Sequence, residues 1–176
     1  MSSSSSAKTK ARGDDPETEI AEAIAAENQC YAAVDRSRVT LGMHICRGNS
    51  RSRWAIQGGY DAIAERVFNA LDVDRFLLEY DTDRAGSFEP LRFVPKNKVV
   101  VLGLISTKVP QLENEDSILR RIEDATRYIP IEQLALSPQC GFASVKEGNL
   151  ITADDQRKKL ELVLQIARKV WGDALN

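Results

Sequence analysis

The sequence is poor in several features that would otherwise define its class. It has no apolar run near the ~20 residues that span a bilayer, and it has no hydrophobic segment typical of a signal peptide. Its three cysteines are odd in number and scattered, which excludes a disulfide framework and favours a reduced, cytoplasmic setting. The net charge of −2 provides no electrostatic basis for binding nucleic acid or an anionic membrane, so we expect neither as a partner.

What is present indicates one folded domain after a short tail. The 176 residues are 43% hydrophobic and 28% charged, which is enough to form a core. Residues 1–14 begin with five serines after the methionine and continue with basic residues but few apolar ones. We therefore predict a disordered tail over 1–14 and a folded domain over 15–176.

Strand and helix patterns alternate through the domain. Apolar runs predict strands over 39–46, 75–80, 98–106 and 133–137. Helical spacing predicts helices over 16–34, 60–71, 88–93 and 115–128, and from 152 to just before 172. Strands separated by helices imply a parallel sheet and the α/β class. Four such strands fit either a small doubly wound sheet or half of a (β/α)8 barrel.

Two of these helices carry predictions about burial. Cys30, in the first helix, is expected to be a small buried hydrophobic residue. The last helix has a capping-box pattern, Thr152 followed by Asp155, and should begin there. Its apolar residues are expected to face the core; they are Leu160, Val163, Leu164, Ala167 and Val170.

The first strand contains the only histidine of the chain. His44 and Cys46 are two residues apart, so on a strand they point to the same face, and we expect them to end a buried strand. Glu79 lies near the end of the second strand, and Cys140 follows the fourth. Because sites in parallel α/β folds gather at the carboxyl ends of the strands, these four zinc-type ligands are predicted to share one edge. The third strand ends instead in Ser106, Thr107 and Lys108.

Each of these residues, taken alone, has a simpler interpretation. His44 would be a satisfied polar residue, Cys46 and Cys140 would pack in the core, and Glu79 would pair with Arg84 or Arg92. Their joint placement favours a metal site. Zinc lowers the pKa of a coordinated thiol, and two cysteines, one histidine and a displaceable glutamate suit the alkylation of a substrate thiol.

Four segments resemble the cobalamin-independent methionine synthase family, and most closely its short, single-barrel members. They are HICRGN (44–49), FLLEYD (76–81), VVLGLISTK (100–108) and LALSPQCGF (134–142), and the final stretch EGNLITADDQRKKLELVLQIARKVWG is also similar. The resemblance implies a TIM barrel with zinc at its carboxyl end. It also implies that the zinc ligands are His44, Cys46, Glu79 and Cys140, although the spacing from Cys46 to Glu79 looks longer than in the methionine synthases proper.

The activity implied by the resemblance belongs to methionine biosynthesis. The family transfers a methyl group from 5-methyltetrahydropteroyltriglutamate to the zinc-bound thiolate of homocysteine, so a thiol substrate and a methyl-folate donor are the expected partners. A related subgroup, the epoxyalkane:coenzyme M transferases, alkylates another thiol. This sequence resembles only the C-terminal half of the barrel. It is therefore expected to join a complementary half, to self-associate, or to be a non-catalytic zinc-binding fragment.

The residues around the first two ligands carry further hypotheses. Arg47, Arg51 and Arg53 could bind an acidic substrate tail through their guanidinium groups or could be ordinary solvated arginines. Trp54 could stack on a pterin ring or pack within the fold. Asp81 is predicted to share the strand face of Glu79 and to orient the imidazole of His44.

Overall fold

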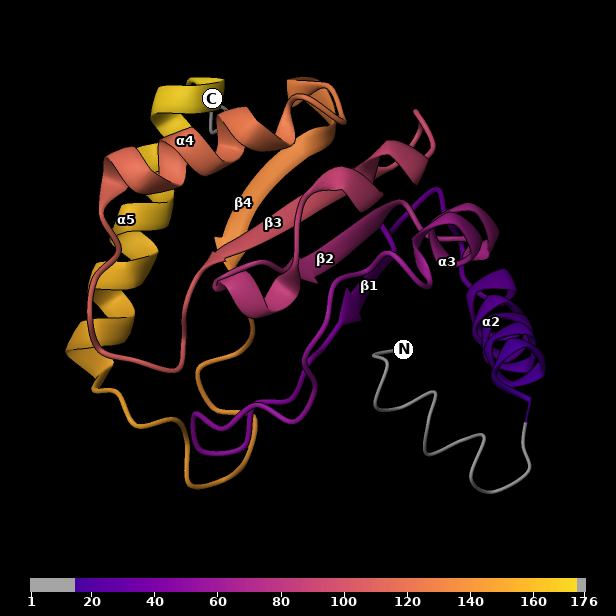
Figure 1. The fold of residues 1–176 in the computed structure, drawn as a ribbon, viewed down its shortest axis with the longest axis horizontal. Coiled ribbons are helices and arrows are strands. Elements are labelled where there is room, and N and C mark those ends of the chain that lie inside the picture. The colour runs from indigo at the N-terminus through magenta and orange to yellow at the C-terminus, as the bar shows by residue number, and fades with distance from the viewer. Residues whose placement is uncertain (1–14, 174–176) are drawn as a thin grey trace.

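The computed structural model describes residues 15–173, so the predicted tail over 1–14 lies outside the described residues. Helices and strands alternate along the chain (Figure 1). The helices are α2 (Pro16–Ala32), α3 (Ala64–Ala70), α4 (Glu115–Ala125) and α5 (Ala153–Trp171). The strands are β1 (Gly42–Ile45), β2 (Arg75–Glu79), β3 (Val99–Ile105) and β4 (Leu134–Pro138). Three short 3-10 helices span Asp83–Ala85, Glu89–Phe93 and Ile131–Gln133.

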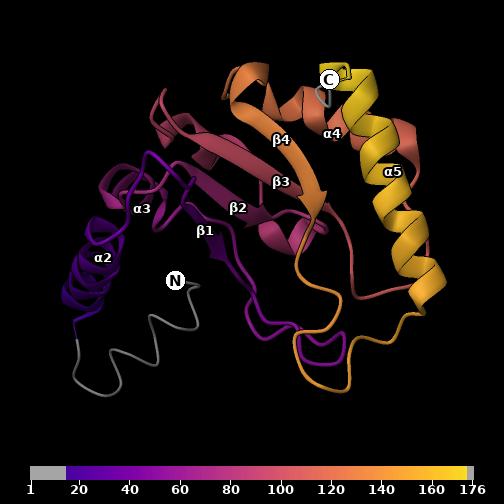
Figure 2. The same ribbon diagram turned by 180° about the vertical axis from the view of Figure 1, so that it is seen from behind.

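The four strands form one parallel sheet in the order β1-β2-β3-β4. Figures 1 and 2 show α2 and α3 beside β1 and β2, and α4 and α5 beside β3 and β4. This arrangement confirms the α/β class and the four parallel strands predicted from the alternation. The strand order follows the chain without a reversal, as it does in part of a (β/α)8 barrel, and not as in a doubly wound sheet.

The two faces of the sheet differ in burial. One face carries the row Phe76, Val100 and Leu134, which is buried within the hydrophobic core together with Leu78 and Leu102. The opposite face carries the row His44, Leu77, Val101 and Ala135, in which only Val101 is buried. Parity along the strands therefore places His44, and with it Glu79, on the less covered face.

An irregularity interrupts the pairing of β3 with β4. The register shifts between Gly103 and Ile105, which pair with Ser137 and Pro138. A Cβ atom at Gly103 would lie 2.7 Å from the Cα of Gln139, closer than real Cβ contacts allow. The absence of a side chain here lets the end of β4 approach β3 closely.

Three sequence-based expectations about burial are wrong. The first strand is shorter than predicted, and it is a half-exposed edge strand instead of a buried one. Cys30 is exposed, because α2 lies at the periphery and contains no buried residue. The capping box of α5 is present, but Leu160 and Leu164 are exposed; the buried residues of this helix are Lys159, Leu162 and Ile166.

The described helices are too short or too polar to act as bilayer spans.

Candidate metal centre

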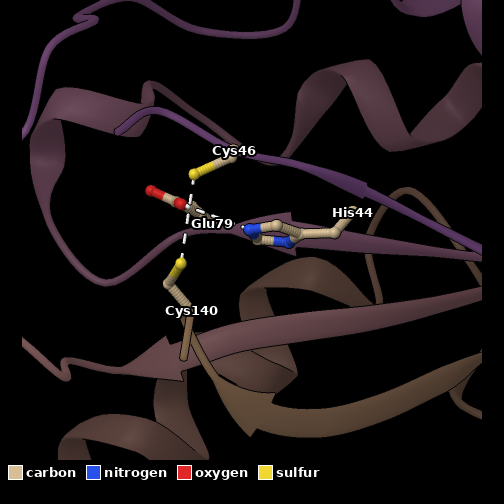
Figure 3. A group of neighbouring side chains, drawn as sticks. All are labelled: His44, Cys46, Glu79 and Cys140. Atoms are coloured by element: carbon tan, nitrogen blue, oxygen red, sulfur yellow. Dashed lines mark hydrogen bonds and ion pairs between the residues drawn. The ribbon is translucent and has the colours of Figure 1, made fainter. Parts of the chain in front are cut away.

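Four side chains from three strand ends converge at the carboxyl edge of the sheet (Figure 3). His44 lies on β1 and Cys46 directly follows it, Glu79 is the last residue of β2, and Cys140 follows β4. One potential ligand atom from each lies within 4.8 Å of all the others. The structure therefore brings together all four residues that the sequence placed at this edge.

The separations between these atoms match a tetrahedral zinc site. Two thiolates bound at about 2.3 Å to a tetrahedral zinc lie about 3.8 Å apart. The sulfur atoms of Cys46 and Cys140 are 3.9 Å apart, and Nε2 of His44 is 3.5 Å from Oε1 of Glu79. The Glu79 side chain is fully buried, yet its Oε2 has no hydrogen-bond partner. A buried carboxylate oxygen is costly unless it is paired or coordinates a metal, so these residues fit a zinc ion.

Backbone groups hold the ligands in place. Leu77 O lies 3.2 Å from Nδ1 of His44, which suits the Nδ1–H tautomer and leaves Nε2 free to coordinate. The backbone N–H of Arg47 donates to Oε1 of Glu79 at 3.2 Å. The hydroxyl of Tyr60 accepts from the backbone N–H of Glu79 at 2.9 Å, and Tyr60 itself is buried. The chain thus orients each side chain through neighbouring strands and loops.

The four groups perturb one another strongly. A hydrogen bond to Cys140, followed by one to Glu79, raises the pKa of His44 to about 11. The same contact with His44 is the largest cause that lowers the pKa of Cys140 to about 7. Burial raises the pKa of Glu79, but hydrogen bonds from His44 and from the Arg47 backbone outweigh it and leave the pKa lowered. Burial raises the pKa of Cys46. Without metal, a proton on His44 therefore provides the positive charge that the two acidic neighbours favour.

The residues predicted to contact substrate lie in different surroundings. The guanidinium of Arg47 is buried over the ring of Tyr60, 4.2 Å from its centroid, and donates to the carbonyl of Gly58. Arg51 is exposed and has a positive φ of 48°. Their role in substrate binding stays a prediction. Trp54 is 48% exposed and stacks with the guanidinium of Arg84, so it is not a core residue.

Asp81 does not orient His44. Its Oδ2 accepts from the hydroxyl of Ser106 at 2.9 Å, and its Oδ1 lies 3.6 Å from Arg84. The prediction assumed that strand alternation continues past Glu79, but β2 ends at that residue. Arg84 is thereby engaged by Asp81, and Arg92 pairs with Glu89, so neither is the partner of Glu79.

A buried polar network beside the ligands was not anticipated from the sequence. The side-chain oxygen of Gln139 accepts from both the backbone N–H and the hydroxyl of Thr107, at 2.8 and 2.6 Å. Asn149 donates to the carbonyl of Thr107, and Asn49 donates to the carbonyl of Gly141. These bonds tie together the loops that follow β1, β3 and β4. The available signal was the change from apolar to polar residues directly after each strand.

Comparisons with known proteins agree on one family. A sequence model described as the catalytic domain of cobalamin-independent synthase matches residues 8–168. YxjH of Bacillus subtilis is 51% identical over 164 residues, which are 92% of this chain and 43% of YxjH. A methionine synthase of Pyrococcus horikoshii is 27% identical over 139 residues, which are 73% of this chain and 37% of that protein.

A solved structure extends the match to the fold. A Listeria monocytogenes protein assigned as a vitamin-B12 independent methionine synthase superposes with a TM-score of 0.71 at 34% identity. The match covers 91% of this chain and 43% of that protein. The chain therefore spans less than half of the length of the relatives it matches.

Proposed function

The chain belongs to the cobalamin-independent methionine synthase family, and on that basis we propose that it provides the zinc-binding half of a methyltransferase of this type. The reaction would transfer a methyl group from 5-methyltetrahydropteroyltriglutamate to the thiol of homocysteine, in methionine biosynthesis. The observation that carries the proposal is the convergence of four ligand atoms within 4.8 Å at the carboxyl edge of the sheet.

The proposed ligands have distinct roles in this chemistry. A zinc ion held by His44, Cys46, Glu79 and Cys140 would lower the pKa of a coordinated substrate thiol, so that the thiolate is present near neutral pH. Leu77 O and the backbone N–H of Arg47 would keep His44 and Glu79 oriented toward the ion. Because Glu79 carries the only oxygen ligand of the set, it is the group that we expect a substrate sulfur to displace.

The open edges of the sheet support a role for a complementary half-barrel. Both β1 and β4 pair on one side only, and an apolar groove flanks each of them. The groove between α2 and β1 measures about 350 Å³, and the groove between β4 and α5 measures about 390 Å³. We propose that further (β/α) units pair with both strands, cover these grooves and complete the substrate surface.

Zinc content separates this proposal from a merely ancestral relationship. The purified chain should contain about one zinc per molecule by mass spectrometry of metals. Cys46→Ser should retain less than roughly a tenth of that amount. Cys30→Ser is the matched control, because Cys30 is exposed on α2 and is not among the four converging residues, and it should bind zinc as the unchanged chain does. Equal zinc in both variants would contradict the site.

An activity assay then tests the reaction. Methyl transfer to homocysteine should be measured with the chain alone and with the part of YxjH that this chain does not match. Turnover in either case that is lost in Cys46→Ser would support the proposed reaction. Alkylation of coenzyme M without turnover of homocysteine would favour the epoxide-opening subgroup. Zinc binding with no turnover in any mixture would identify a non-catalytic zinc-binding half-barrel.

A further inference from the structure

A second cavity opens at the carboxyl edge, beside the metal centre. It measures about 490 Å³ and lies between the loops that follow β1, β2 and β3. We call it the Lys108 cavity; six of its lining residues are Ser52, Trp54, Asp81, Arg84, Ser106 and Lys108. None of the four proposed zinc ligands lines it.

The charged groups of this cavity are paired with one exception. Asp81 faces Arg84 at 3.6 Å, and Glu113 is bound by the buried ammonium of Lys159 at 3.0 Å. Lys108 is only 8% exposed, and its Nζ has no hydrogen-bond partner among the described residues. A buried ammonium without a partner costs free energy, so a fold that keeps one has a site poised to receive an anion.

We propose that the Lys108 cavity binds the carboxylate of an organic ligand, with the carboxylate seated on Nζ of Lys108. The single uncompensated positive charge matches a monoanion. A phosphate dianion would leave one negative charge in excess, close to the carboxylates of Asp81 and Glu113. A carboxylate can also accept from the nearby hydroxyls of Ser52 and Ser106, which line the same cavity.

The remaining walls indicate what the carboxylate is attached to. The Trp54 ring is 48% exposed and has the Arg84 guanidinium 4.9 Å from its centroid. Val109 and Leu112 also line the cavity and are exposed. A flat tryptophan and two aliphatic side chains favour a ligand whose body is aromatic or otherwise apolar.

The position of the cavity relates it to the metal centre. Lys108 lies close enough to Glu79 for its charge to contribute to that residue's acidity. If the proposed function holds, the ligand is therefore the carboxylate-bearing end of a substrate that reacts at the neighbouring zinc. This identification rests on the proposed function, whereas binding of a carboxylate at Lys108 does not require any metal.

Binding should therefore be measured on the full chain after zinc has been removed with EDTA. Benzoate is the probe, benzamide its neutral counterpart and inorganic phosphate the competing anion, with NMR titration of the Trp54 indole as the readout. Lys108→Met removes the charge and keeps most of the volume. Lys146→Met, in an exposed loop outside the cavity, is the matched control, and Lys108→Arg restores the charge.

We expect benzoate to bind and to shift the Trp54 signal, with Kd raised roughly 10- to 100-fold in Lys108→Met. Lys146→Met should bind as the unchanged chain does, Lys108→Arg should recover part of the affinity, and benzamide and phosphate should bind at least about tenfold more weakly. Equal binding of benzoate to Lys108→Met, or of phosphate and benzoate to the unchanged chain, would overturn the proposal.

Thermal unfolding provides a second, independent measurement. If Nζ of Lys108 has no partner in the ligand-free protein, Lys108→Met should keep or raise the Tm, because an unpaired buried charge is removed. A lower Tm for this variant than for Lys146→Met would mean that Lys108 serves the fold, which would overturn the assignment. Since zinc is absent from both experiments, their outcome is independent of whether the chain binds metal.

Discussion

Two buried lysines at opposite ends of β3 show how the edges of the sheet differ. Lys98 precedes the strand and is 7% exposed, and Lys108 follows it and is 8% exposed. Nζ of Lys98 donates to the carbonyls of Phe68 and Leu71 at 2.8 and 2.5 Å, so it caps the end of α3. Nζ of Lys108 has no such partner. The same residue type at equal burial thus serves stability at one end and remains available at the other.

The contrast holds beyond this pair. Among residues 15–173, the buried side-chain atoms without a hydrogen-bond partner all belong to residues at or after the carboxyl end of a strand. They are found on Arg47, Asn49, Glu79, Tyr80, Asp81, Arg84, Lys108 and Gln139. Unsatisfied polar groups are costly, so their restriction to one edge indicates that this edge, and not the amino edge, is built to meet ligands.

The largest effect that would sharpen this comparison is expected at the carboxyl edge. Cys140→Ser removes one of four proposed zinc ligands, which share a binding free energy of about 10–16 kcal/mol, so zinc affinity should fall by ~100-fold or more. The unfolding free energy of the metal-free chain should change by less than about 0.5 kcal/mol, because Cys140 lies outside the hydrophobic core. Chelator competition and urea unfolding in EDTA provide the two measurements. An equal loss of stability in the metal-free chain would break the contrast.

At the amino edge we expect the reverse pattern. Lys98→Met leaves the carbonyls of Phe68 and Leu71 without their donor, which should cost about 2–3 kcal/mol of unfolding free energy. Zinc stoichiometry should remain unchanged. Lys96→Met, two residues earlier and exposed, is the control and should unfold as the unchanged chain does. If Lys98→Met lost zinc while keeping its stability, the division between the edges would be wrong.

A smaller, pH-dependent effect is expected from Asp74, also at the amino edge. The backbone N–H of Leu41 donates to its carboxylate at 2.7 Å and is the largest cause that lowers the pKa of Asp74 below 3.8. A carboxylate with a lowered pKa in the folded state stabilises the protein above its unfolded pKa, and this contribution is lost as the pH falls through the folded pKa.

The Tm of Asp74→Asn should therefore lie below that of the unchanged chain at pH 7, and the gap should narrow as the pH falls below 3.8. The neighbouring Asp72, whose side chain is 70% exposed, is the control, and Asp72→Asn should show a smaller gap at pH 7. A gap for Asp74→Asn that is constant down to acid unfolding would show that charge is not the cause.

How far the sequence predicts this molecule depends on the range of the signal. The convergence of His44, Cys46, Glu79 and Cys140 was predictable, because strand alternation and the common edge of parallel strands are general rules. Asp81 was misplaced because alternation stops where β2 stops, one residue after the last paired position that the pattern could test. Local periodicity does not reveal where a strand ends in space.

The helices show the same limit. Several faces of α5 carry apolar residues, and periodicity alone favoured Leu160 and Leu164 over Leu162 and Ile166. The buried face also includes Lys159, which is accommodated only because Glu113, far away in sequence, meets its charge. Cys30 was misplaced because α2 lies at the rim of the fold, where an apolar stripe is only partly covered. Each of these outcomes depends on tertiary partners.

The register shift between β3 and β4 gives a residue that bears no ligand control over the dimensions of the metal centre. Gln139, whose Cα approaches Gly103, is the neighbour of Cys140, so the backbone at 103 acts as a spacer that determines how far this cysteine reaches toward the other three groups. The geometry of the centre is thus inherited from the architecture of the sheet as much as from the chemistry of its side chains. Divergence at position 103 would detune metal selectivity while every coordinating residue stayed intact.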